Sequence, residues 1–271
     1  MCHKPLIVSR QNGELIDVAA IARSPMIYLD NWALSGVFAN DRARQRRLLD
    51  ALQKRGTLLV SWANIMELPA YPPIRALFDG IGANWYPLEW NFFLCIRKEE
   101  QLSPGQNSPA LGTGLLETYY PFVHESVYSL GELLSLTGKY RERVEAARNK
   151  IKDAVQSLVN LVKSTYSKDP NWLDKEFPSI PLNPQKPTRY VLNHLMRALA
   201  SESGFTFTAN DGMDLVHTVV PVAYADFVLL DKSWTRRVRS LPMVGRNVYA
   251  FYEAEIDQFL DGLDSLVVVP R

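Results

Sequence analysis

The sequence is poor in cysteine, in net charge and in long apolar runs. Cys2 and Cys95 are the only cysteines in 271 residues, too few for a disulfide framework or a cysteine-rich zinc site. Thirty Lys and Arg face 29 Asp and Glu, so the net charge of +1 requires that any polyanion be held by local patches. Charged residues interrupt 1–24, and no uncharged run is long enough to span a bilayer. We therefore expect a cytoplasmic protein with no membrane partner.

Two common catalytic motifs are also missing. The segment Gly112-Thr113-Gly114 lacks the preceding strand and the lysine of a phosphate-binding loop. No G-x-S-x-G sequence is present, so the nucleophile elbow of serine hydrolases is absent. The chemistry of this chain must therefore be sought in other side chains.

Short apolar runs alternate with helical patterns near both ends of the chain. A strand at 26–29, a helix at 41–55 and a strand at 57–60 have the length of a right-handed βαβ unit, which makes the strands parallel. Further strands are predicted at 85–88, 227–230 and 247–251, with helices at 232–240 and 253–263.

The segment between these two ends is mostly helical and includes a Pro/Gly/Ser-rich loop at 103–114, a helix at 115–136 and a second loop at 167–187. We predict an α/β fold, a three-layer α/β/α sandwich around a mostly parallel sheet, with a large helical insertion. The predicted divisions are an N-terminal arm at 1–25, a core formed by 26–88 and 206–271, and the insertion at 89–205.

Four acids are predicted to meet at one edge of this sheet. Asp30 and Asp231 each follow an apolar strand, and ligands of open α/β sheets bind at the carboxyl ends of the strands. Glu67 lies about two turns after the helix cap Ser61, so it returns to the side facing the strand end. Asp214 lies on a short helix that Asn210 can cap, in line with Asp211 and His217.

Such a group of carboxylates needs protons or a cation. Two like charges about 4 Å apart repel by roughly 4 kcal/mol at an effective dielectric constant of 20. Ligation by oxygen alone suits Mg²⁺ or Mn²⁺, and either ion activates water and neutralises charge on a phosphate. The four acids therefore predict a divalent metal site.

The motifs YLDNW (28–32), SWANIMEL (61–68), DLVH (214–217) and ADFVLLD (225–231), in this order, resemble a PIN-like domain. This resemblance covers about 26–88 and 206–262 and implies an α/β/α fold of metal-dependent nucleases, mostly ribonucleases. It implies that Asp30, Glu67, Asp214 and Asp231 are the first to fourth acids around Mg²⁺ or Mn²⁺. The chain departs from the pattern at Leu229, where many members have Thr, and at Asn31, which directly follows the first acid.

Several other residues have two interpretations. Asp211 is a further ligand or a first-turn acid favoured by the helix dipole, and Asp226 is a reserve ligand at the far end of its strand. His194 and His217 are expected to be packed and hydrogen-bonded rather than catalytic. The roles of two further sets of residues are open. The arginines either contact phosphate or lie on a solvated face, and the tryptophans either stack on bases or pack in the core. They are Arg236, Arg237 and Arg239, and Trp32, Trp62 and Trp234.

The sequence therefore predicts a metal-dependent endonuclease that hydrolyses phosphodiester bonds, with single-stranded or structured RNA as the expected substrate. DNA is the alternative substrate. The alternative function is a catalytically silent PIN-like scaffold whose helical insertion binds a protein. An inhibitory partner protein and a homo-oligomer are both compatible with the sequence.

Overall fold

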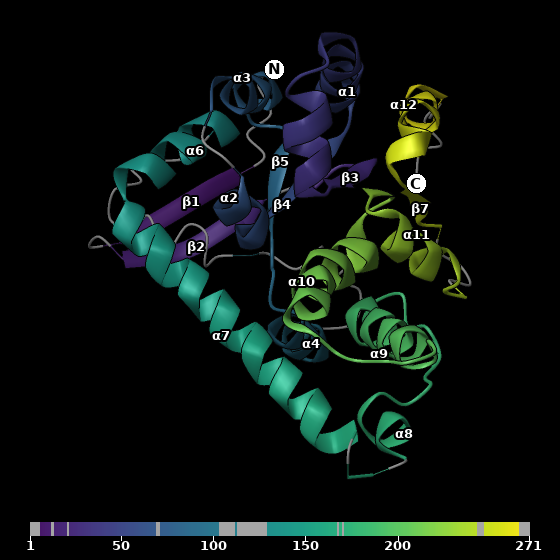
Figure 1. Cartoon of the computed structure of the whole chain (residues 1–271). Coiled ribbons are helices and arrows are strands. Elements are labelled where there is room, and N and C mark those ends of the chain that lie inside the picture. Colours follow the sequence, from purple (N-terminus) through teal and green to yellow (C-terminus); the bar gives the residue numbers. More distant parts are fainter. Residues whose placement is uncertain are drawn as a thin grey trace.

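A five-stranded, all-parallel sheet forms the centre of the protein (Figure 1). The computed structural model describes residues 6–11, 14–20, 22–68, 71–102, 112, 129–166, 168–169, 171–242 and 247–265. The strand order is β5-β4-β3-β6-β7. The bounds are β3 Met26–Leu29, β4 Thr57–Ser61, β5 Trp85–Leu88, β6 Phe227–Leu229 and β7 Tyr249–Phe251. The predicted three-layer α/β/α sandwich is confirmed.

Strand β3 is the point at which the order of the strands reverses. The chain passes from β3 to β4 on one side, whereas β6, which comes much later in the sequence, pairs with the other side. Leu29 is in register with Leu229, so the residues that follow β3 and β6 lie next to each other. Ligands of parallel sheets bind at such a switch point.

Two groups of helices cover the sheet. In the first group, η1 and α12 pack against α1, α3 contacts both η1 and α1, and α6 packs on α3. In the second group, α2, α4, α7, α9 and α11 pack around α10. The bounds are η1 Ala33–Phe38, α1 Arg42–Lys54, α2 Trp62–Glu67, α3 Pro72–Ile81, α4 Phe92–Gln101, α6 Leu130–Lys139, α7 Arg141–Tyr166, α9 Pro187–Ala200, α10 Ala209–Tyr224, α11 Lys232–Arg239 and α12 Ile256–Ser265.

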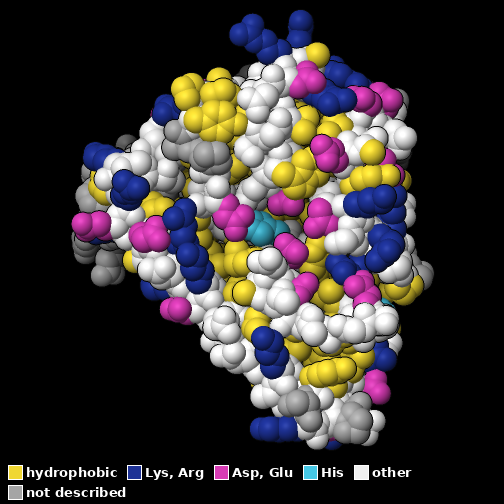
Figure 2. Space-filling view, viewed as in Figure 1, with side chains coloured by type: hydrophobic (Ala, Val, Ile, Leu, Met, Phe, Trp, Pro, Cys, Tyr) yellow, Lys and Arg dark blue, Asp and Glu magenta, His cyan; other side chains and the backbone are white. Residues whose placement is uncertain are grey.

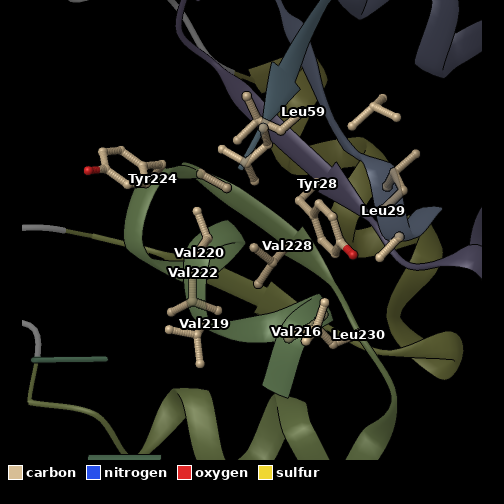
Figure 3. Close-up of a cluster of buried hydrophobic side chains, with 14 of the residues drawn as sticks. Tyr28, Leu29, Leu59, Val216, Val219, Val220, Val222, Tyr224, Val228 and Leu230 are labelled. Carbon is tan, nitrogen blue, oxygen red and sulfur yellow. The ribbon is translucent and has the colours of Figure 1, made fainter. Parts of the chain in front are cut away.

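Helix α10 differs from the short helix expected after Asn210. Its N-cap is Thr208, which forms a reciprocal capping box with Asp211, and it continues through Pro221. A proline inside a helix removes one backbone hydrogen bond. Here that loss is offset by burial, because apolar side chains of α10 pack with those of β3, β4 and β6 in one cluster (Figure 3).

Other segments were less well predicted. The arm at 1–25 contains an antiparallel hairpin of β1 Leu6–Gln11 and β2 Glu14–Ala20, although the periodicity of its sequence is weak. A short helix, α8 Trp172–Glu176, lies within the loop expected at 167–187, and a 3-10 turn, η2 Glu253–Glu255, precedes α12. Most of the predicted loop at 103–114 and helix at 115–136 lies outside the described residues.

Within the described part of the chain, no helix is both long enough and apolar enough to cross a membrane.

Candidate functional site

Asp30 and Asp231 are held at the carboxyl ends of neighbouring strands by their own backbone and by a helix start. The backbone N–H of Asp30 donates to the carbonyl of Leu229 at 3.0 Å, and its Oδ1 accepts from the N–H of Asn31 at 2.7 Å. Asp231 is the N-cap of α11, and its Oδ1 accepts from the N–H of Trp234 at 2.8 Å. Both carboxylates therefore have fixed positions at the switch point of the sheet.

Glu67 ends helix α2 and turns back toward β3, as its position after Ser61 predicts. Ser61 and Asn64 form a capping box that fixes the start of α2. The Nδ2 of Asn31 donates to Glu67 Oε2 at 2.7 Å. Arg148 of α7 donates to the carbonyl of Met66, so the insertion supports the end of this helix. The Asn31 side chain thus links the first acid's loop to the second acid.

Helix α10 supplies Asp214 and His217 from positions one turn apart. The indole N–H of Trp234 donates to Asp214 Oδ2 at 2.8 Å. His217 is 6% exposed, and its Nδ1 lies 2.9 Å from the hydroxyl of Tyr28. Its Nε2 lies 3.2 Å from Glu67 Oε2 but makes no well-aligned hydrogen bond with the described residues. The histidine is therefore buried and packed, as expected, but it lies among the acids.

These side chains surround a small hollow. Figure 2 shows acidic side chains gathered around a histidine near the centre of this face. The hollow has a volume of about 10 Å³, which is the space of one water-sized group. Its lining residues are Asp30, Asp214, His217, Thr218, Leu230, Asp231 and Trp234.

The ionised forms of two acids are disfavoured in this hollow. Burial, together with the carboxylates of Asp231 and Asp30, raises the pKa of Asp214 to about 6, although the Trp234 hydrogen bond opposes the rise. Burial also raises the pKa of Asp30, with smaller contributions from Glu67 and Asp231. Like charges and partial dehydration act in the same direction at both residues. A bound cation would relieve both effects.

At Glu67 and His217, in contrast, the charged forms are favoured. Burial alone would raise the pKa of Glu67, but His217 and the Asn31 amide lower it below its usual value. Burial alone would lower the pKa of His217, but Glu67, Asp30 and Asp214 together raise it. The pair therefore favours a charged imidazolium beside a charged carboxylate.

The donor chemistry of the hollow suits a hard divalent cation, but the side chains do not form a closed site. Asp30, Asp214 and Asp231 each use one carboxylate oxygen in a hydrogen bond and have a second oxygen without a donor from the described residues. Free carboxylate oxygens are the ligands that Mg²⁺ and Mn²⁺ prefer. Yet no three His, Cys, Asp or Glu side chains in the described ranges are grouped closely enough to hold a metal ion as they stand.

Two of the acids considered from the sequence do not join the group. Asp211 accepts the Thr208 hydroxyl at 2.6 Å in the capping box, as the first-turn interpretation predicts. Asp226 accepts the N–H of Met26 at 2.8 Å, so it lies at the amino ends of β3 and β6. The length of the strand separates Asp226 from Asp231, and its role as a reserve ligand is wrong.

The arginines of α11 are largely engaged within the protein. Arg237 pairs with Glu202 through two hydrogen bonds of 2.9 Å, and Arg239 donates to the carbonyl of Ala250 and to Glu255. Arg236 is 77% exposed and lies 3.7 Å from Glu202. Arg236 is therefore the most accessible of the three to a phosphate.

The three tryptophans also differ in how far they are buried. Trp62 and Trp234 are 4% and 2% exposed, which agrees with a role in the core. Trp32 is only partly buried and lines an open groove next to the hollow. One of the three is therefore placed where it can meet a ligand.

No protein-family model, curated protein or solved structure matches this chain. The resemblance to PIN-like domains thus depends on the four short motifs and on the order of their acids along the chain.

Proposed function

We propose that the protein is a metal-dependent endonuclease of the PIN-like kind, which hydrolyses phosphodiester bonds. The observation that supports this most is the convergence of Asp30, Glu67, Asp214 and Asp231 from four separate segments. Carboxylates that raise one another's pKa are costly to a fold unless they serve a ligand. A small hollow lined by three of them, Asp30, Asp214 and Asp231, gives that ligand the space of one ion or one water.

Asp30, Asp214 and Asp231, with Glu67 beside them, would hold Mg²⁺ or Mn²⁺. When bound, such an ion supplies an activated water and neutralises charge that develops on the phosphate. The surrounding residues act as positioning residues. Trp234 orients Asp214, Asn31 and His217 orient Glu67, and the Tyr28 hydroxyl fixes the imidazole of His217.

RNA is the proposed substrate because the resemblance points to ribonucleases, and DNA is its alternative. The test incubates purified protein with end-labelled single-stranded RNA or DNA in Mn²⁺, in Mg²⁺ or in EDTA. We expect cleavage that requires a divalent ion and is lost in Asp30→Asn. Asp226→Asn is the matched control, because it changes an aspartate at the other end of the same strands and should leave cleavage intact.

A second candidate is a catalytically silent scaffold whose helices bind a protein partner. The absence of a ready-made group of three metal-binding side chains in the described residues favours it. The two candidates differ in their response to metal. A nuclease site should gain thermal stability from Mn²⁺ by mass action. If Mn²⁺ leaves the melting temperature unchanged and neither polymer is cut, the nuclease proposal is wrong.

A further inference from the structure

The long helix α7 of the insertion contacts both helices that carry acids of the candidate site (Figure 1). Helix α2 ends at Glu67, and helix α10 carries Asp214 and His217. These two helices meet at the site, where His217 Nε2 lies 3.2 Å from Glu67 Oε2. None of the described side chains of α7 lines the hollow. Any influence of α7 on the acids must therefore pass through α2 and α10.

The contact between α7 and α2 is made by an arginine. Arg148 donates through Nη2 to the carbonyl of Met66 and through Nη1 to Glu145 Oε2 at 2.9 Å. Carbonyl groups in the last turn of a helix have no partner within that helix, so this one is free to accept a bond from outside. Met66 directly precedes Glu67. The arginine therefore fixes the stretch of backbone from which the Glu67 side chain extends.

The contact between α7 and α10 depends on a glycine. Val155 and Val159 are 4% and 2% exposed, and both lie against Gly212. A Cβ atom at Gly212 would lie 2.8 Å from Val155 Cγ1, which is closer than packed side-chain atoms approach. Valine is stiff about χ1, so it cannot easily turn away. Gly212 thus permits a close approach of the two helices two residues before Asp214.

Arg148 and Val155 are seven residues apart, which places them about 10 Å apart on one face of α7. We propose that α7 is a rigid support that sets the separation of α2 and α10 and thereby positions Glu67 and Asp214 beside the hollow. This inference rests on the proposed function, in which it gives the insertion a role. Arg148, Val155 and Gly212 are positioning residues, because they act through the two acids.

The first test disturbs the contact with α10 and then restores it. Gly212→Ala places a methyl group against Val155, and Val155→Ala in the same chain removes the methyl groups that obstruct it. Alanine favours a helix more than glycine does, so local propensity alone would stabilise Gly212→Ala. Gly138→Ala is the control, because Gly138 lies in α6 and no atom lies within 4 Å of the added Cβ.

Two properties of the full chain are measured: Mn²⁺ affinity by titration calorimetry, and kcat and KM for cleavage of single-stranded RNA. We expect Gly212→Ala to bind Mn²⁺ about ten- to a hundredfold more weakly and to lose kcat with little change in KM. The double variant should recover most of both losses, and Gly138→Ala should match the wild type. A purely structural contact would lower the melting temperature without changing the Mn²⁺ affinity of the folded protein.

The second test removes the contact with α2. Arg148→Met keeps an unbranched side chain but loses the donor to Met66. Loss of a positive charge by itself favours a bound cation, whereas loss of position weakens its binding, so the two effects have opposite signs. We expect Mn²⁺ affinity to fall by about tenfold. Lys152→Met is the control, because it removes the same charge from an exposed position one turn further along α7 and should not weaken Mn²⁺ binding.

The inference is overturned if either Gly212→Ala or Arg148→Met binds Mn²⁺ like the wild type, or if Val155→Ala does not restore the affinity of Gly212→Ala. Cleavage by the wild type would then leave the proposed nuclease standing. If the wild type neither cuts nor binds Mn²⁺, the nuclease proposal fails, and amide hydrogen exchange in EDTA decides the role of α7. Faster exchange at 62–68 in Arg148→Met and at 209–216 in Gly212→Ala would retain the support, and unchanged exchange would overturn it.

Discussion

Helix α10 borders two carboxylate environments that differ in their neighbours. Through Asp214 it faces the acid hollow, where the nearest charged groups include further carboxylates. At its C-terminal end, Tyr224 donates to Glu99 of α4 at 2.5 Å. Glu99 is 2% exposed and also accepts from the backbone N–H and the hydroxyl of Thr188. Burial raises the pKa of Glu99 and of Asp214, but only Glu99 is surrounded by donors.

This difference separates a structural acid from a functional one. The hydrogen bonds of Glu99 join α4, α9 and α10, so its carboxylate is satisfied by the protein alone. Asp30, Asp214 and Asp231 each keep one oxygen without a donor from the described residues. Burial by itself therefore does not mark a site. Burial among like charges with free oxygens does.

The largest stability effect should come from breaking the structural acid. Glu99→Leu leaves the Thr188 N–H and the Tyr224 hydroxyl buried without an acceptor, so we expect the free energy of unfolding to fall by about 2–4 kcal/mol. Urea denaturation measures this. The neighbouring Glu100→Leu is the control, because Glu100 is 53% exposed in an ion pair with Arg189 and should change stability by no more than about 0.5 kcal/mol. Equal effects in the two variants would contradict the comparison.

In the acid hollow, removing a carboxylate should raise the free energy of unfolding rather than lower it. Asp30→Asn removes one of the repelling charges and keeps an oxygen to accept the N–H of Asn31. We expect this variant to be more stable than the wild type in EDTA at neutral pH by about 0.5–2 kcal/mol, the gain typical of a relieved functional site. The wild type should instead gain stability from Mn²⁺ and the variant should not. Loss of stability in EDTA would show that Asp30 has a structural role like that of Glu99.

Part of the acid site could be predicted from the sequence, because local rules place Asp30, Glu67 and Asp231. Apolar runs that end at Asp30 and Asp231 predict strand-end carboxylates, and the cap at Ser61 predicts the direction of Glu67. Contacts between different helices and loops could not be predicted from local rules. The bond from Trp234 to Asp214 depends on how α11 packs on α10, and the pairing of Arg237 with Glu202 depends on a loop far from it in sequence.

The start and end of α10 show a second limit. Asn210 and Thr208 are both good caps, and the capping box with Asp211 decides for Thr208. The helix passes Pro221 because its buried faces outweigh the lost hydrogen bond, which is a tertiary effect. Nothing in the sequence distinguishes Glu99 from a surface residue, since a glutamate on an amphipathic helix normally faces water.

The pH dependence of stability sharpens the comparison further. The pKa of Asp214 is raised from its ordinary 3.8 to about 6, so its contribution to stability is full below the lower value and is lost as pH rises through the upper one. The pKa of Glu99 is also raised, so its contribution to stability is likewise lost as pH rises. Without metal, unfolding midpoints should therefore fall as pH increases, and Asp214→Asn and Glu99→Gln should each flatten the curve.

Mn²⁺ should distinguish the two acids in that experiment. A metal needs ionised ligands, so Mn²⁺ should restore stability above about pH 6 and lose affinity by roughly tenfold per pH unit below it. Glu99→Gln should keep this metal response, and Asp214→Asn should lose it. A metal response that is independent of pH between 5 and 7 would mean that Asp214 is not a ligand.

The smallest effect should follow from removing a single positioning bond. Trp234→Phe keeps a ring beneath the guanidinium of Arg237, which lies 4.8 Å from the ring centre, but it removes the 2.8 Å bond to Asp214. That bond opposes the rise in the pKa of Asp214, so its loss should raise this pKa further. We expect a loss of stability of about 1 kcal/mol and less than about tenfold loss of cleavage at pH 6.

Trp172→Phe is the control, since Trp172 is equally buried but packs on Phe177 of the insertion. If both variants lose stability but only Trp234→Phe moves the acidic limb of the cleavage profile to higher pH, the indole positions a working carboxylate. If neither variant moves that limb, the bond only holds α11 on α10.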